Sequence, residues 1–145
     1  MINTIKEIND KLQAFVNLSA IVNEYQSGDF STFNSADHKY PLIYMTPLKF
    51  RIQSGMVQFV VNIAVMDLIY DKNDLIKVLS DLGIILTELF IYLTDDAENQ
   101  QYFITLASVS EFQPWFRGID NTCGFQGDVT FNLAGNMSIL NVRMK

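Results

Sequence analysis

The sequence has very few of the residues from which metal sites, disulfides and nucleophilic active sites are built. Among its 145 residues there is one cysteine, Cys123, and one histidine, His38. A single cysteine excludes an internal disulfide and a cysteine-based metal cluster. A lone histidine without cysteines at ligand spacing does not predict a zinc site. We therefore expect neither a metal nor any other cofactor.

Charge and long apolar runs are also scarce. Charged residues make up 18% of the chain and hydrophobic residues 49%, which is typical of a folded domain and not of a disordered one. The net charge of −6 disfavours a general binder of the phosphate backbone, which needs a basic face. The most apolar stretch, residues 83–93, is about half as long as the roughly 20 residues that span a bilayer. Residues 1–20 carry four charges and do not resemble a secretory signal, so we expect a soluble, cytoplasmically made chain with no membrane partner.

Two segments have the periodicity of amphipathic helices. Residues 2–25 repeat apolar side chains every three or four positions, and this helix is expected to stop before the turn formers at 27–29. Residues 75–93 carry leucines at steps of four and three, flanked by further apolar side chains. This pattern predicts a long helix that packs across a sheet, with Asp71 or Asn73 as its cap.

Four segments are predicted to form strands. Residues 40–45 form the first, and Pro47 is expected to end or kink it. Residues 56–69 alternate strictly and predict a half-buried strand near thirteen residues long, which either bends over a helix or extends past the core toward a neighbour. Residues 102–109 and 124–133 form the last two strands.

This order predicts an α+β fold. It has an N-terminal helix and a mostly antiparallel sheet of four to five strands, with one long helix packed across the sheet. The length predicts a single domain over residues 1–145, ending in a tail over about 135–145. Residues 26–39 are small and polar and predict a flexible loop that contains Phe30 and Phe33. Loops of this length are usually functional, so the two rings either dock on a partner or tuck back onto their own domain.

The candidates for catalysis are weak. His38 lies in the polar loop without a rigid shell around it, and Cys123 has no histidine near it in sequence to lower its pKa. Asp71, Asp74 and neighbouring carboxylates lack the spacing of a calcium loop. Gly124 and Gly127 precede a strand, whereas a phosphate-binding loop precedes a helix. We therefore interpret the chain as a protein that is not an enzyme.

A second group of residues is suited to protein contacts. Trp115 and Phe116 stand next to Arg117 in the connection between the last two strands. Aromatic residues and arginine are enriched at the centres of interfaces, although aromatic residues also fill cores. Both interpretations remain open at this stage.

Several segments resemble a known group of proteins. They are residues 40–47, the end of the long strand at 65–68 with the leucine-rich helix after it, and residues 112–116 and 120–125. Over residues 36–134 the chain resembles small virion proteins of tailed bacteriophages that infect Bacteroidetes and their relatives. The order of elements also looks like the tail-terminator, tail-completion and head–tail connector fold.

The resemblance implies a ring-forming subunit of the virion at the head–tail junction or tail, assembled in the host cytoplasm. It implies a homo-oligomer, hexamer or dodecamer, that contacts other tail or neck proteins, lets phage DNA pass and catalyses nothing. In such rings a loop, an extended hairpin and the C-terminal tail make subunit contacts. The interface residues expected here are Phe30, Phe33, Arg51, Gln53, Met56, Trp115, Phe116, Arg117 and Arg143.

Three alternatives are kept. The chain is another tail component, of the tube or baseplate, or it is a small soluble module that binds a ligand in an apolar cavity between sheet and helix. The third alternative is an enzyme that uses carboxylates such as Asp67 and Asp71 in a cleft.

Overall fold

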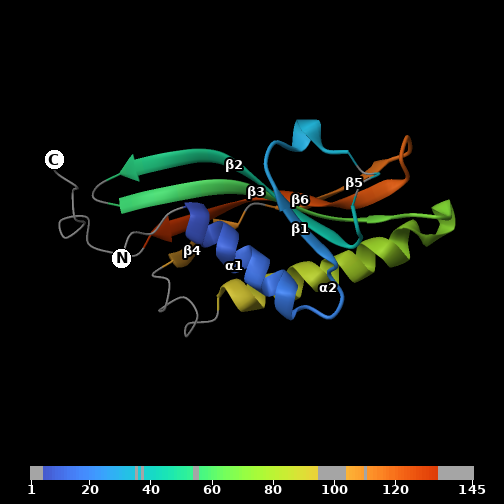
Figure 1. Cartoon of the computed structure of the whole chain (residues 1–145), viewed down its shortest axis with the longest axis horizontal. Helices are drawn as coiled ribbons and strands as arrows, with labels where there is room; N and C mark the ends of the chain where they lie inside the picture. Colours follow the sequence, from blue (N-terminus) through green and yellow to red (C-terminus); the bar gives the residue numbers. More distant parts are fainter. Residues whose placement is uncertain are drawn as a thin grey trace.

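The computed structural model describes residues 5–34, 36, 38–53, 56–94, 104–109 and 111–133. Both helices of this part of the chain lie on the same face of a mixed sheet (Figure 1). The elements are α1 (Ile5–Leu18), β1 (Glu24–Ser27), the 3-10 turn η1 (Phe30–Thr32), β2 (Leu42–Gln53), β3 (Met56–Leu68), the 3-10 turn η3 (Lys72–Asp74), α2 (Leu75–Leu93), β4 (Ile104–Val109), β5 (Gln113–Arg117) and β6 (Thr122–Leu133). The predicted α+β class, N-terminal helix and long helix against the sheet are confirmed.

The sheet is built around β3. This strand pairs with β6 from Val57↔Leu133 to Leu68↔Thr122, and on its other side it pairs with β2. The strand order is β1-β2-β3-β6-β4. β5 also pairs with β6, at residues 122–126, whereas β4 pairs with β6 at residues 129–133. All of these pairs are antiparallel except β1–β2, which is parallel.

The first helix is shorter than its periodicity predicts. It ends at Leu18, and the Ser19 hydroxyl oxygen then accepts the backbone N–H groups of Ile21 and Val22 at 3.2 and 3.1 Å. Tyr25 is still buried, as the periodicity requires, but it lies on β1. Its hydroxyl donates to Asn9 Oδ1 of α1 at 2.7 Å. A strand therefore supplies the last apolar contacts that were expected from a helix.

Pro47 kinks its strand and does not end it. β2 continues to Gln53, with a β-bulge between Pro47 and Lys49. β1 pairs with β2 only as far as Met45, so among the described residues Pro47 lies on an unpaired edge, where its missing N–H is tolerated. The segment around Trp115, expected as a connection, forms the strand β5.

Each face of the sheet carries an apolar cluster. The larger cluster lies between the sheet and the helices. Lys11 of α1 is also buried, at 2% exposed, and its ammonium lies 5.4 Å from the centroid of the Tyr92 ring, which packs against this cluster. The smaller cluster lies on the opposite face. Its members are Leu42, Tyr44, Ala64 and Met66, with Phe30, Phe33, Tyr40 and Trp115 packed against them.

Candidate interaction surfaces

The far end of the β2–β3 hairpin leaves large apolar side chains exposed. We call residues 48–52 the ribbon tip: Leu48 is 46%, Phe50 53% and Ile52 66% exposed. The Phe50 ring lies 4.9 Å from that of Phe59, on the face that the helices cover further along the sheet. In Figure 1, β2 and β3 extend beyond the start of α1, and so this end of the hairpin lies outside the helix layer.

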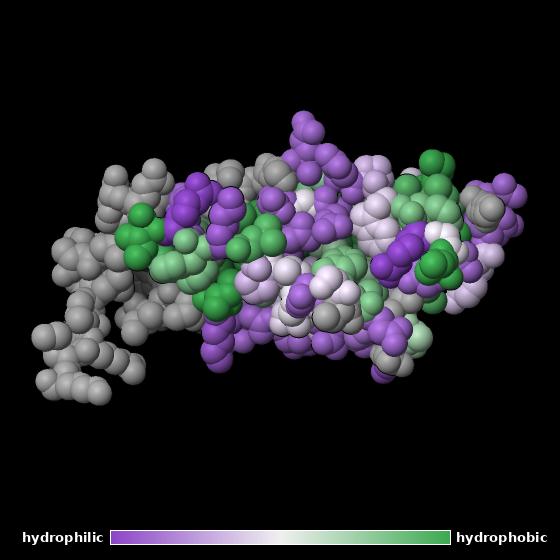
Figure 2. All heavy atoms as spheres, turned by 90° about the horizontal axis from the view of Figure 1, so that it is seen from above, coloured by the Kyte–Doolittle hydropathy of each residue, from purple (hydrophilic) through white to green (hydrophobic). Residues whose placement is uncertain are grey.

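The ribbon tip is also a basic part of an acidic chain. Residues 40–66 contain two basic side chains, Lys49 and Arg51, and no acidic one. Lys49 and Arg51 pair with Val60 and Gln58, on the sheet face opposite the helices. Figure 2, the view from above, shows hydrophobic and strongly hydrophilic atoms side by side at the ribbon end on the left. By register, Phe50 and Ile52 lie on the helix side of the tip, and Lys49 and Arg51 lie on the opposite side.

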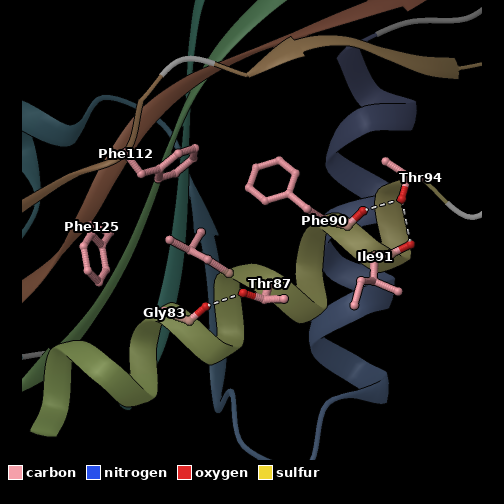
Figure 3. Close-up of a pocket in the computed structure, with 8 residues that line it drawn as sticks. Gly83, Thr87, Phe90, Ile91, Thr94, Phe112 and Phe125 are labelled. Carbon is pink, nitrogen blue, oxygen red and sulfur yellow. Dashed lines mark hydrogen bonds between the residues drawn. The ribbon is translucent and has the colours of Figure 1, made fainter.

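A second surface is an apolar groove beside α2 (Figure 3). Its volume is about 600 Å³, and it is open to solvent. Its lining residues come from α2 and from the β5–β6 side of the sheet, and none is charged. They are Gly83, Leu86, Thr87, Phe90, Ile91, Thr94, Phe112 and Phe125.

The polar atoms of this groove are already engaged. Thr87 Oγ1 donates to the carbonyl of Gly83 at 2.9 Å, and Thr94 Oγ1 donates to that of Phe90 at 2.8 Å. Threonine hydroxyls that bond back to the helix in this way leave their methyl groups toward the surroundings. Phe90 meets Phe112 edge to face, with ring centroids 5.6 Å apart. The groove therefore offers apolar contact and few open hydrogen bonds.

Two glycines shape this groove in opposite ways. A Cβ added at Gly83 would meet nothing within 4 Å, whereas one added at Gly127 would come within 2.7 Å of Phe112 Cδ1. Gly127 thus lets the Phe112 ring lie directly on β6 as a wall of the groove. On the opposite face Gly124 does the same for Trp115, whose Cζ2 would lie 2.9 Å from an added Cβ. The sequence shows both glycines but not the rings that cover them.

The loop phenylalanines tuck back onto their own domain. Phe30 and Phe33 lie 5.5 Å apart, and both contact the Tyr44 ring, at 5.3 and 5.4 Å between centroids. Phe30 also meets Trp115 edge to face at 6.2 Å. The second of the two expected alternatives for this loop therefore applies, and both rings are half-buried.

The other expected interface residues are scattered over the molecule. Arg117 donates twice to the carboxylate of Asp120, at 3.1 and 2.6 Å, within its own turn. Phe116 is 44% exposed, whereas Trp115 is half-buried in the smaller cluster. Arg51 is exposed on the ribbon tip. The backbones of Gln53 and Met56 pair at the end of the hairpin, but their side chains, the turn between them and the tail with Arg143 lie outside the described residues.

The candidates for catalysis, His38 and Cys123, do not line the groove. His38 stacks on Phe33 at 4.8 Å and pairs through Nδ1 with the carboxylate of Glu24. Cys123 is buried opposite Asp67 of β3, and burial, with that carboxylate beside it, raises the pKa of the thiol to about 11. A thiol with this pKa stays protonated at neutral pH and is a poor nucleophile. The described residues contain no group of three or more side chains suited to a metal.

A polar hollow lies on the face opposite the helices, and sequence reasoning missed it. Its volume is about 360 Å³. Gln126 Nε2 donates to Asn62 Oδ1 and Asn62 Nδ2 donates to Asp128 Oδ1, each at 3.0 Å. These side chains bond to one another across β3 and β6, so they stabilise the sheet. In the sequence, these polar residues alternate with apolar ones along the two strands, and this alternation is the signal from which the polar face could have been predicted.

Comparison with known proteins does not assign the chain to a family. No family model matches the sequence, and no curated protein matches it. In the part of the chain that the structure describes, no helix is long and apolar enough to cross a membrane. The ribbon tip and the groove are accordingly the features on which a functional proposal depends.

Proposed function

We propose that this protein is a structural subunit of a tailed-bacteriophage virion, a tail-terminator or neck (head–tail connector) protein. It acts by associating with copies of itself in a ring, a hexamer or dodecamer, and by docking to neighbouring tail or head proteins. Phage DNA passes through the ring without specific binding, and no catalysis is involved. The observation that carries the self-association is the ribbon tip.

The exposed apolar side chains of the ribbon tip are unfavourable for a protein that functions as a monomer. Three apolar side chains, Leu48, Phe50 and Ile52, are exposed within five residues, and the outer edge of β2 is unpaired beyond Met45 among the described residues. Exposed apolar edges promote association, and natural proteins prevent unwanted strand pairing at such edges with bulges, prolines and basic side chains. This edge carries two of these devices, Pro47 and Lys49, and its apolar side chains are nevertheless exposed. This combination favours one specific partner over indiscriminate aggregation.

The virion context comes from the resemblance. Its segments fall on β2, on the end of β3 with α2, and on the β5–β6 hairpin. These segments include α2 and the β5–β6 side of the groove, and the first of them ends one residue before the ribbon tip. A tube or baseplate component would use the same surfaces, and the shape of the assembly separates these cases.

The test is the mass and shape of the purified chain at micromolar concentration, by light scattering and negative-stain electron microscopy. We expect a closed ring for the natural chain and a folded monomer for Ile52→Asp. The matched control is Ile119→Asp, which makes the same change at a side chain that is 95% exposed on the β5–β6 turn, at the other end of the molecule (Figure 1). A natural chain that is monomeric at every concentration contradicts the proposal.

The groove favours a second candidate, a small ligand-binding module. Its 600 Å³ lies within the range of about 300–1,000 Å³ that is typical of ligand sites. An apolar small molecule that co-purifies with the monomer, seen by native mass spectrometry, would support this function. Loss of that mass in a variant with a filled groove would locate it.

A further inference from the structure

We propose that the ribbon tip of one copy of this chain binds in the groove beside α2 of the next copy. The proposal rests on the self-association proposed above and names the surface that receives the tip. It joins two different surfaces, so each copy uses its tip toward one neighbour and its groove toward the other.

The first support is the fit between a projecting surface and a hollow one. The groove has a volume of about 600 Å³ and is open to solvent, and the tip presents the large side chains of Phe50 and Ile52. These two side chains share one face of the hairpin and are more than half exposed. The tip does not line the groove of its own chain, so the groove is open to the tip of another copy.

The second support is the chemistry of the groove. It contains no charged side chain, and the hydroxyls of Thr87 and Thr94 are bonded to the helix backbone. Apolar side chains that enter therefore displace water without leaving a buried polar group unpaired. Ile91, which lines the groove, is 66% exposed, and Ile84, next to Gly83 on α2, is 54% exposed. They extend the apolar surface on which Leu48 of the neighbour would lie.

The third support is Gly83. Glycine in the interior of a helix is less favourable than alanine, and nothing in its own chain occupies the space in front of it. A glycine at such a position lets another backbone approach closely. A strand that enters the groove from a second copy would use this space.

The fourth support is charge. Residues 69–94, which comprise α2 and the connection before it, contain four acidic and two basic side chains, whereas residues 40–66 contain two basic and no acidic ones. Opposite charge steers the tip toward the α2 side of a neighbour, and like charge disfavours the pairing of two tips. An interface between different surfaces repeats from copy to copy and closes into a ring when the rotation allows.

The experiment uses two variants, each defective in one surface. Ile52→Asp places a charge on the tip and leaves the groove intact, whereas Gly83→Phe fills the groove and leaves the tip intact. Gly83→Ala is the matched control, since a methyl group leaves most of the groove open. Circular dichroism establishes that every variant is folded, and Thr87→Tyr is a second groove-filling variant in case Gly83→Phe does not fold.

We expect each defective variant to be monomeric, with self-association weakened at least about tenfold, as expected when one large apolar contact is lost. Mixed in equal amounts, the two variants should form a dimer and nothing larger, because one intact tip then meets one intact groove. Gly83→Ala should assemble like the natural chain.

The outcomes separate this inference from the proposed function. If Ile52→Asp is monomeric while Gly83→Phe and Thr87→Tyr assemble normally, the tip mediates association but the groove does not receive it. If both variants are monomeric and their mixture stays monomeric, the two surfaces do not pair with each other. If Ile52→Asp assembles normally, the proposed role of the tip is itself wrong. A small molecule that stays in the groove of the assembled protein also overturns the inference.

Discussion

Replacing Gly83 with alanine is expected to stabilise the protein. Gly83 is an interior residue of α2, a helix of 19 residues, and it faces the groove. Alanine has fewer conformations available in the unfolded chain and is the best helix former, so this change favours the folded state. The change in the free energy of unfolding tests whether the groove is as open at Gly83 as its geometry indicates, independently of any partner.

The magnitude follows from the surroundings of Gly83. A Cβ at this position meets no atom within 4 Å, so the substitution neither improves nor strains packing. The difference in helix propensity alone remains, about 0.8–1.0 kcal/mol in the free energy of unfolding. For a chain of this size that corresponds to a rise in Tm of about 2–4 °C.

The assay is urea denaturation followed by circular dichroism. Every protein compared also carries the substitution Ile52→Asp, so that self-association does not contribute to its stability. Ser80→Ala is the matched control on the same helix, where the loss of a hydroxyl that donates to the Ile76 carbonyl is expected to give a smaller gain. A lower midpoint for Gly83→Ala, at an unchanged m-value, would refute the reasoning, because the space beside Gly83 would then be occupied.

Three further changes test other parts of the structure. Gly127→Ala should lower the free energy of unfolding by about 1–3 kcal/mol because the new Cβ overlaps the Phe112 ring, and unchanged urea stability would contradict that contact. Burial raises the pKa of Asp67, with Leu68 N–H opposing the shift and Asp81 adding to it. A carboxyl whose folded-state pKa is raised makes a stabilising contribution that is lost as pH rises through that pKa. Asp67→Asn should therefore raise the Tm at neutral pH, and it should reduce the fall in Tm that the natural chain shows as pH rises above the ordinary pKa of aspartate. Thermal melts in which the variant and the natural chain lose stability in parallel over this pH range would count against it. The buried Cys123 thiol, with its pKa of about 11, should react with a thiol reagent only as fast as the protein opens, so rapid labelling of the native chain would be inconsistent with its burial.

Periodicity predicted the elements whose signals are local. The leucine spacing gave α2, and the alternation of residues 56–69 gave β3 within one residue at its end. That strand's length left two possibilities, a bend over a helix or an extension past the core. The structure extends it past the helix layer (Figure 1), which is where the ribbon tip arises.

The parts that were missed depend on contacts between distant segments. β1 has four residues, and its strand conformation comes from parallel pairing with β2. The groove combines α2 with Phe112 and Phe125, which no local spacing connects. Phe112 is held by the absence of a side chain at Gly127 on a neighbouring strand. A sequence shows such a glycine, but the residue that occupies the space follows only from the register of β5 and β6.

Sedimentation velocity of the natural chain beside Ile52→Asp, over a concentration series through the micromolar range, tests the central claim most directly. Self-association through the ribbon tip predicts one discrete large species for the natural chain and a single folded monomer for the variant. Two identical profiles, whether both monomeric or both assembled, would contradict it.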